Sequence, residues 1–228
     1  IVFLLALTAA ALVHCAIGSG DFRVVNGYPA QHKQFPWMIS MYHCSASILD
    51  ETTILTAGHC VCNNPPSVMI AGIINAHEKS SSRQEISVSR IIVHPNYQQS
   101  CGRVHEYDAA IVKLSRPLQF NEYVKPISIN CGDEPQSGTR IINMGFGADE
   151  NNKYDVLKYG HNSLTNCYGG YLCSPRSPNH VYFGDSGGPV VRQTSQGYEQ
   201  IGVNSGIGSY SLYAATHKFC VWSKQYMG

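Results

Sequence analysis

The segment Gly184-Asp185-Ser186-Gly187-Gly188-Pro189 constrains the fold and the chemistry of this chain more than any other. Glycines on both sides of Ser186 permit a tight turn that exposes the hydroxyl and lets backbone N–H groups point at one spot. A serine hydroxyl alone is a poor nucleophile and needs a base to accept its proton. If Ser186 is a nucleophile, the chain must also supply that base and a group that orients it.

Two other segments supply these groups. His59 stands near the end of an apolar stretch at 55–60, and Asp108 stands at the head of another at 107–114. Imidazole is suited to accept a proton near neutral pH, and a buried carboxylate can fix its tautomer and stabilise the imidazolium. Taken singly, such a histidine or aspartate is most often an ordinary core, surface or turn residue. The three together, in the chain order His, Asp, Ser, favour nucleophilic catalysis.

Length and composition narrow the class of protein. The 228 residues suffice for one or two compact units, and 16 basic against 15 acidic residues give a net charge of +1. This balance disfavours strong nucleic-acid binding. Charged residues make up 14% and hydrophobic residues 43%, which argues against disorder. The 21 glycines and 11 prolines are typical of a turn-rich β protein.

Short β-rich runs separated by turn sequences recur along the chain, as in an antiparallel sandwich or barrel. Helical periodicity occurs only near the C-terminus, at 216–226, where Phe219, Trp222 and Tyr226 are three and four residues apart. A linker is expected around 115–124. The sequence therefore predicts an all-β fold with a C-terminal helix. The expected strands cover 37–42, 46–49, 53–55, 68–74, 86–93, 109–114, 140–144, 188–192 and 200–204.

The first residues read as a secretory signal. The apolar run from Ile1 to Val13 is too short to span a bilayer but matches the core of a signal peptide, so we expect a signal at 1–18 and a secreted protein. The alternative is a core strand or helix at the terminus. Setting Cys15 aside leaves eight cysteines, which suit a disulfide framework in an exported chain. No other apolar run approaches the length of a membrane span, so no membrane association is expected.

The motifs together resemble the chymotrypsin-like (trypsin-fold) serine protease family. Residues 56–60 read Thr-Ala-Gly-His-Cys, similar to the family's Thr-Ala-Ala-His-Cys, and residues 108–110 read Asp-Ala-Ala, similar to its Asp-Ile-Ala. Residues 184–189 match its serine motif without a change. The resemblance covers nearly all of the chain after Arg23. It implies two antiparallel six-stranded β-barrels, at about 24–115 and 125–228, with the active site between them.

The resemblance also implies a role for each residue. Ser186 would attack a peptide carbonyl, His59 would act as general base and then general acid, and Asp108 would orient His59. The N–H groups of Gly184 and Ser186 would form the oxyanion hole. The expected partners are protein or peptide substrates and protein protease inhibitors, for a monomer that needs no cofactor. The alternative is a non-catalytic serine-protease homologue that uses the fold for binding.

Activation by cleavage is implied as well. Residues 23–27 read Arg-Val-Val-Asn-Gly, which resembles the family's Arg-Ile-Val-Gly-Gly junction. Cleavage after Arg23 by a trypsin-like protease would free the α-amino group of Val24 to pair with Asp185. A buried carboxylate without such a partner is costly. Residues 19–23 are then a short propeptide, and 24–228 is the protease domain.

The specificity pocket departs from the trypsin-like pattern. In this family the residue six before the nucleophile lies at the pocket floor, and here it is His180 where trypsin-like members have Asp. No Asp or Glu occurs at 174–183 or 203–215, so we expect poor cleavage after Arg or Lys and a preference for apolar or aromatic residues. Ser205 and Ile207 are expected at the other wall. Two alternatives remain, namely that His180 is a solvated loop residue or that it accepts acidic side chains when protonated.

The family pattern pairs Cys44 with Cys60 and, in a shortened loop, Cys167 with Cys173. The loops that carry Cys62 and Cys101 should lie side by side, and Cys131 and Cys220 are then left to pair. No metal site is expected, because the metal-ligand spacings are absent. The calcium loop of some relatives would here place Ile73 at its first ligand position.

Overall fold

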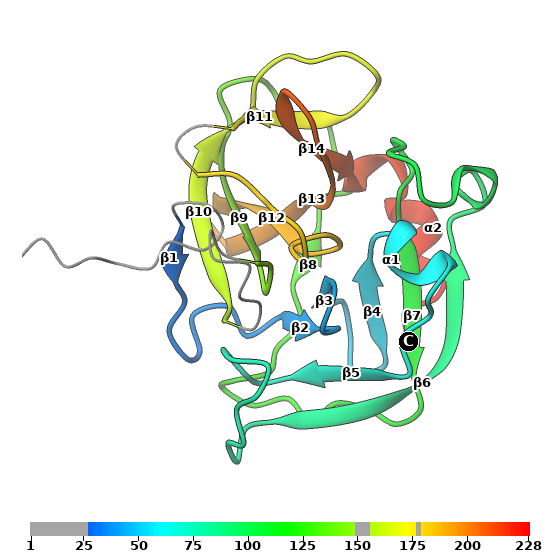
Figure 1. Cartoon of the computed structure of the whole chain (residues 1–228), viewed down its shortest axis with the longest axis vertical. Helices are drawn as coiled ribbons and strands as arrows, with labels where there is room; N and C mark the ends of the chain where they lie inside the picture. Colours follow the sequence, from blue (N-terminus) through cyan, green and yellow to red (C-terminus); the bar gives the residue numbers. More distant parts are fainter. Residues whose placement is uncertain (1–26, 149–155, 177–178) are drawn as a thin grey trace, which may run out of the picture.

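A computed structural model describes residues 27–148, 156–176 and 179–228. Two β-rich halves pack against each other, and a short helix lies at the C-terminus (Figure 1). The expected signal peptide, the propeptide and the Arg23–Val24 junction lie outside the described residues. In the ranges that are described, no helix has the length and apolar character needed to cross a membrane.

The first half is a closed antiparallel barrel with the strand order β2-β3-β4-β7-β6-β5. Pairing of Ile39 in β2 with Ala71 in β5 closes it, so neither strand is left as an exposed edge. Ile, Val and Met side chains from these strands fill the interior and exclude water from it. The strands are β2 (Met38–Ser40), β3 (Ser45–Ile48), β4 (Thr53–Thr56), β5 (Val68–Ala71), β6 (Gln84–Val93) and β7 (Ala110–Leu114).

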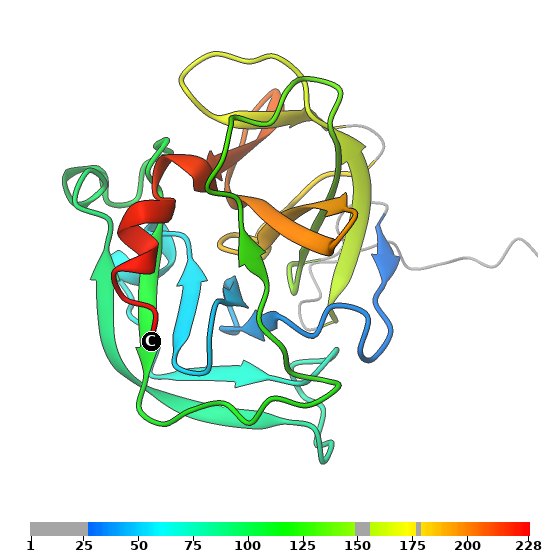
Figure 2. The ribbon, with the colours of Figure 1, turned by 180° about the vertical axis from the view of Figure 1, so that it is seen from behind.

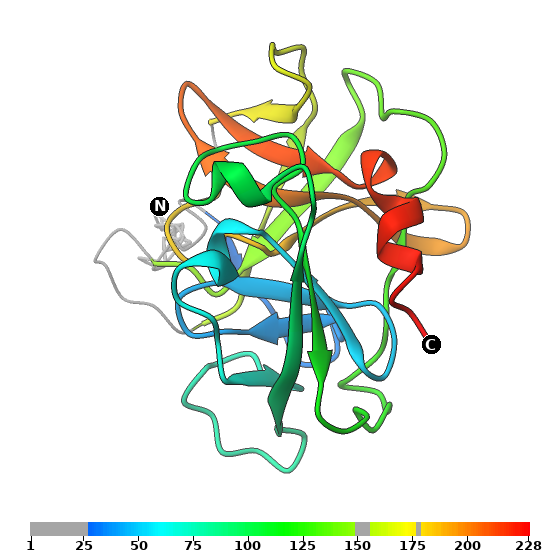
Figure 3. The same ribbon diagram turned by 90° about the vertical axis from the view of Figure 1, so that its right-hand side faces the viewer.

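The second half is a curled sheet (Figure 3). It has eight strands in the order β1-β10-β9-β12-β13-β14-β11, with β8 pairing in parallel with β13. The expected all-β class is confirmed, as one closed six-stranded barrel and this sheet. The first strand, β1, joins the second half. The strands are β1 (Tyr28–Pro29), β8 (Ser128–Ile129), β9 (Arg140–Gly145), β10 (Lys158–Ser163), β11 (Leu172–Pro175), β12 (Pro189–Thr194), β13 (Gly197–Ile207) and β14 (Tyr210–Ala215).

The C-terminal segment ties the halves together. It leaves β14 of the second half and lies over the first half (Figure 2). Lys113 of β7 donates to the carbonyl of Tyr226 at 2.7 Å and to Thr53 Oγ1 at 2.6 Å, which fixes the chain end to the barrel. The expected helix at 216–226 is present as two short pieces. The helical segments are α1 (His59–Cys62), η1 (Gln98–Ser100), η2 (Thr216–Lys218) and α2 (Cys220–Lys224).

Among the described residues, four disulfides are formed, with sequence separations from 6 to 89 residues. They are the pairs that the family resemblance and the remaining cysteines implied. Cys131–Cys220 joins the segment between the two halves to α2, and Cys62–Cys101 joins the loops that flank His59 and Asp108. The four pairs are Cys44–Cys60, Cys62–Cys101, Cys131–Cys220 and Cys167–Cys173.

His94 is buried where α2 meets the loop before β7. Its ring stacks on Tyr107 with centroids 4.9 Å apart and contacts the edge of Trp222 at 4.7 Å. The backbone N–H of Asn96 donates to His94 Nδ1 at 3.2 Å, so that nitrogen must be unprotonated. Burial, with a smaller contribution from His105, lowers the pKa of His94 to about 4.

This pKa makes stability depend on pH. Between the unfolded value of about 6.5 and the folded value, the unfolded chain binds the proton and the folded chain does not. The stabilisation by neutral His94 is therefore full above pH 6.5 and is lost as the pH falls to about 4. His94→Phe keeps an aromatic ring and removes the titration. Urea unfolding at several pH values should show that the free energy of unfolding falls by about 3 kcal/mol more for the wild type than for the variant over this range. Equal losses would contradict the assignment.

Candidate active site

His59 and Asp108 come together because their strands pair. His59 follows β4, Asp108 precedes β7, and Thr56 lies opposite Ala110 in the β4–β7 ladder. His59 Nδ1 lies 2.7 Å from Asp108 Oδ2, and the His59 backbone N–H donates to Asp108 Oδ1 at 2.9 Å. Asp108 is fully buried. The imidazole is thus held at Nδ1, and its Nε2 lies on the opposite side of the ring.

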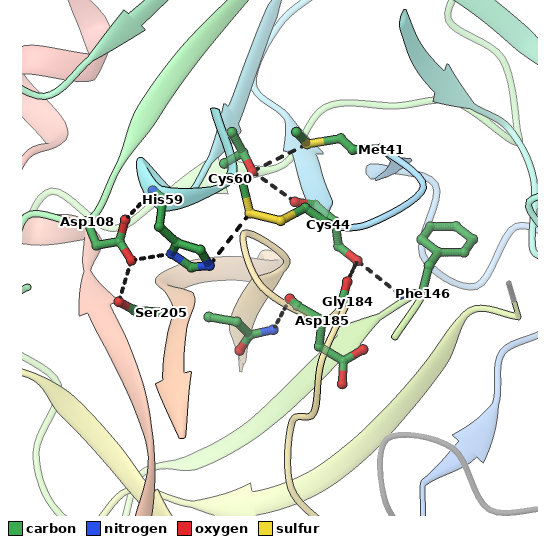
Figure 4. The surroundings of a disulfide bond; sticks show 12 residues. Met41, Cys44, His59, Cys60, Asp108, Phe146, Gly184, Asp185 and Ser205 are labelled. Carbon is green, nitrogen blue, oxygen red and sulfur yellow. Dashed lines mark hydrogen bonds and ion pairs between the residues drawn. A yellow bond between two sulfur atoms is a disulfide. The ribbon is translucent and has the colours of Figure 1, made fainter. Parts of the chain in front are cut away.

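Ser205 on β13 reaches this pair from the second half. Its hydroxyl donates to Asp108 Oδ2 at 2.6 Å (Figure 4). The carboxylate therefore accepts three hydrogen bonds, two from His59 and one from Ser205. The sequence predicts Ser205 at the wall of the substrate pocket and does not predict this bond. The motif around Ser205 carries no signal that points to a partner 97 positions away.

The turn around Ser186 depends on its glycines. Gly184 has φ +93° and Gly187 has φ +79°, a region that glycine adopts without steric cost. In the described part of the chain, neither the N–H of Gly184 nor that of Ser186 donates to a protein acceptor. The turn therefore holds two N–H groups without protein acceptors, one of them on Ser186 itself. The other N–H groups of the turn are bonded internally, Asp185 to the carbonyl of Tyr182, Gly187 to that of Asn204, and Gly188 to that of Asp185.

Ser45 on β3 fixes this turn to the first barrel. The Ser45 N–H donates to the Ser186 carbonyl at 2.8 Å, and its hydroxyl donates to the Gly184 carbonyl at 3.0 Å. The same hydroxyl accepts the N–H of Phe146 at 2.9 Å, which brings in the end of β9 (Figure 4). Ser45 is fully buried. The sequence does not single out Ser45, because a serine beside Cys44 resembles any other strand residue.

Asp185 lies on the inner side of the turn and is fully buried. Its Oδ1 accepts the N–H of Gly147 at 2.9 Å, and its Oδ2 accepts the N–H of Tyr182 at 2.8 Å. A Cβ at Gly147 would lie 2.7 Å from the Asp185 carboxyl carbon, so glycine is required at that position. Burial raises the pKa of Asp185 to about 7, although these two hydrogen bonds oppose the shift.

A cleft of about 450 Å³ contains both His59 and Ser186. Ser205 and Ile207 are among its lining residues. His59 and Ser186 both line this cleft, but the Ser186 hydroxyl makes no hydrogen bond within the described structure, to His59 or to any other group. Such bonds are often long in enzymes without substrate. The remaining lining residues are His43, Cys44, Val181, Tyr182, Phe183, Gly184, Asn204 and Gly206.

His180 is not among the lining residues of this cleft. It is 9% exposed, and its Nε2 lies 3.2 Å from a guanidinium nitrogen of Arg176. The alternative that His180 is a solvated loop residue is therefore wrong. Its neighbour Val181 presents an apolar side chain to the cleft instead.

Ligand-type atoms of Cys44, His59 and Cys60 lie close together at the edge of the cleft. The two cysteines are joined to each other as a disulfide, so their sulfurs are not available as thiolates. His59 is then the one available metal ligand of this cluster, and a single ligand is too few to hold a metal ion.

Gly58 replaces the alanine of the family motif, and Tyr97 explains the change. A Cβ at Gly58 would lie 2.6 Å from a ring carbon of Tyr97. That ring is fully buried, and its hydroxyl donates to the carbonyl of Arg103 at 3.0 Å, so it cannot move aside.

Gly58→Ala should therefore destabilise the protein. Overpacking costs about 1–3 kcal/mol, which outweighs the gain of at most about 1 kcal/mol from replacing glycine next to a helix. Gly132→Ala is a matched control, since the nearest atom to its added Cβ would be 3.5 Å away. Denaturant unfolding should show a net loss of about 1–2 kcal/mol for the first variant and a change within about 0.5 kcal/mol for the second. An unchanged Gly58→Ala variant would contradict the packing argument.

The comparisons with known proteins agree with this geometry. Residues 24–222 match the family model described as Trypsin. The chain is 36% identical over 113 residues to coagulation factor IX of Cavia porcellus, covering 47% of this chain and 39% of that protein. It is 28% identical over 240 residues to phenoloxidase-activating factor 3 of Holotrichia diomphalia, covering 87% and 68%. It is 24% identical over 219 residues to the clotting factor G beta subunit of Tachypleus tridentatus, covering 79% and 69%.

The chain spans 39% of the length of factor IX and about two thirds of the other two relatives. The family model, in contrast, covers nearly all of the described residues, including His59, Asp108 and Ser186. On this match and on the closed barrel facing a curled sheet, the chain belongs to the trypsin family of chymotrypsin-like serine proteases.

Proposed function

We propose that this protein is a secreted serine endopeptidase, made as a zymogen and activated by cleavage after Arg23. One observation carries the proposal. The Asp108-held imidazole of His59 and Ser186 line the same cleft, and the turn that carries Ser186 has two backbone N–H groups without protein acceptors.

The reaction is a two-step acyl transfer. Ser186 Oγ attacks the substrate carbonyl while His59 Nε2 accepts its proton and then returns it to the leaving amine. Asp108 and Ser205 hold His59 in the required tautomer. The N–H groups of Gly184 and Ser186 stabilise the oxyanion, and the loss of one such donor typically raises the barrier by about 2.7–4 kcal/mol. A water molecule then attacks the acyl-enzyme in the same way, with His59 again accepting and returning a proton, and Ser186 is released.

Activation follows from the burial of Asp185. A carboxylate with a pKa of about 7 is only partly ionised at neutral pH, and a positive partner would hold it charged. The α-amino group of Val24, released by a trypsin-like protease, is that partner. On this proposal, residues 1–18 are the signal peptide, 19–23 the propeptide and 24–228 the mature monomeric domain. Removing Asp185 should loosen the turn that carries Gly184 and Ser186.

A fluorophosphonate probe tests the proposal. After cleavage at Arg23, the protein should be labelled on Ser186, as located by peptide mass analysis. Asp108→Asn should slow labelling roughly 10⁴-fold, as in the Ser-His-Asp template, because the histidine tautomer is then wrong. Ser186→Ala serves as the unlabelled control. If the cleaved protein is folded by circular dichroism and Ser186 stays unlabelled, the non-catalytic binding homologue is the correct reading.

The cleft supports an apolar preference at the residue before the cleaved bond. Among the described residues that line it, none is acidic, and Val181, Phe183 and Ile207 are apolar. A substrate guanidinium or ammonium would be desolvated there without a carboxylate partner.

We therefore expect a phenylalanyl anilide to be cleaved with a kcat/KM at least about tenfold above that of the arginyl anilide, since one unpaired buried charge costs more than about 1.4 kcal/mol. Ile207→Gly should widen the wall and raise kcat/KM for the phenylalanyl substrate relative to an alanyl one. Preferred cleavage of the arginyl substrate would show this view of the pocket to be wrong.

The relatives support a protein substrate. Two of them are named as a phenoloxidase-activating factor and a clotting factor subunit. We infer that this enzyme also cleaves proteins, is itself cleaved by another protease and is open to protein inhibitors at the same cleft.

A further inference from the structure

The loop between β6 and β7 carries a second Arg-Val bond. Arg103 is followed by Val104, the same two residues that stand at the Arg23–Val24 junction. The loop protrudes at the edge of the molecule (Figures 1 and 2). The proposed catalytic steps use neither Arg103 nor Val104. A protease that cleaves after Arg23 therefore meets the same pair of side chains again in this loop.

The Arg103–Val104 bond is accessible. Gly102, Arg103 and Val104 are all exposed, and they lie between η1 and β7, outside any helix or strand. Gly102 has φ +82°, and an added Cβ there would meet its nearest atom only at 3.7 Å. Proteolytic cleavage concentrates at exposed turns of this kind. Three other arginines lie instead within hydrogen-bonded strands, namely Arg90 in β6, Arg140 in β9 and Arg192 in β12.

Local contacts fix the bond in the folded chain. The Tyr97 hydroxyl accepts the N–H of Gly102 at 3.1 Å and donates to the carbonyl of Arg103 at 3.0 Å. Val104 is 43% exposed and touches the second half at Gly206, where an added Cβ would lie 2.6 Å from Val104 Cγ2. Opening these contacts does not require the barrel to unfold, and it would present the bond to a protease in extended form.

Cleavage at this bond would divide the catalytic residues between two fragments. His59 lies before the bond, whereas Asp108 and Ser186 lie after it. Each cysteine of the described chain is in a disulfide, and none of these disulfides spans the bond. The pairs before it are Cys44–Cys60 and Cys62–Cys101, and those after it are Cys131–Cys220 and Cys167–Cys173.

The two fragments, 24–103 and 104–228, would be held together by noncovalent contacts alone. The strand β7 of the second fragment lies between β4 and β6 of the first, so the barrel is complete only while the fragments stay bound. Without a covalent link, their association depends on concentration. When the fragments separate, His59 loses the carboxylate of Asp108 that holds it at Nδ1.

We propose that Arg103–Val104 is a second cleavage site for a trypsin-like protease and that its hydrolysis inactivates the enzyme. Water adds across the amide bond and leaves a carboxylate on Arg103 and an ammonium group on Val104. This proposal rests on the proposed function, because only an active enzyme can be inactivated. One class of protease then activates the enzyme at Arg23 and ends its activity at Arg103.

Limited proteolysis tests the proposal. The chain is incubated with immobilised trypsin, which is removed before each sample is reacted with a fluorophosphonate and run on a denaturing, non-reducing gel. Because no described disulfide spans the bond, cleavage after Arg103 should release 24–103 and 104–228 as separate bands. Both the 24–228 and the 104–228 bands contain Ser186. The 104–228 band should carry at least about tenfold less label per molecule, because His59 is no longer held by Asp108.

Three variants sharpen the test. Arg103→Gln should slow both the cleavage and the loss of labelling at least about tenfold, because trypsin needs the cationic side chain. Tyr97→Phe keeps the ring and removes the hydroxyl that holds Gly102 and Arg103, so it should speed this cleavage about threefold or more. Arg90→Gln is the matched control, because Arg90 is also exposed but its backbone pairs with Lys113 in the β6–β7 ladder. It should leave both rates unchanged.

Two outcomes would overturn the proposal. One is a chain that trypsin cleaves after Arg23 and leaves intact after Arg103. The other is a 104–228 band that is labelled as strongly as the 24–228 band, since the cleaved enzyme would then be active. If the chain cleaved after Arg23 is never labelled, the proposed function fails, and the bands on the gel still decide whether Arg103 is a cleavage site.

Discussion

The buried carboxylate of Asp185 is the constraint on which the rest of the site depends. Its two oxygens accept the N–H groups of Gly147 and Tyr182, and these bonds hold the segment that carries Gly184 and Ser186. The carboxylate excludes side chains at neighbouring positions and forces glycine there. Burial raises its pKa, so a positive charge that faces the carboxylate would favour its ionised form. On the proposed function, this turn is the part of the site that responds to cleavage after Arg23.

The two halves supply different residues of the candidate active site. The first barrel supplies His59 and Asp108 from paired strands, and the second supplies the Ser186 turn. Each half also has one buried serine that hydrogen-bonds to the other half. Ser45 of the first half bonds the turn that carries Ser186, and Ser205 of the second half bonds Asp108. These hydrogen bonds lie in a water-poor interior, where loss of either partner would leave a costly unsatisfied group. The relative position of His59 and Ser186 therefore depends on contacts made between the halves.

The candidate catalytic residues could be predicted from the sequence more fully than the strands and contacts that position them. Short motifs mark His59, Asp108 and Ser186, because the local turn chemistry around each is distinctive. The strand β10 was missed because its buried face presents Lys158 and Gly160, which read as polar or turn-forming. The strands β1, β8, β11 and β14 were also missed, since two are very short and the others follow loops or carry polar residues. The environment of His180 depends on Arg176 and the surrounding loop, and no local pattern encodes that contact.

A crystal structure of the chain cleaved after Arg23, with a phosphonate bound covalently, tests the account most directly. The account predicts the phosphorus on Ser186 Oγ, with its oxygen about 2.7–3.1 Å from the N–H groups of Gly184 and Ser186. It also predicts the α-amino group of Val24 at hydrogen-bond distance from the Asp185 carboxylate. A bound phosphonate with Val24 in solvent and Asp185 facing no positive charge would contradict the central claim that a buried ion pair holds this site in its active form.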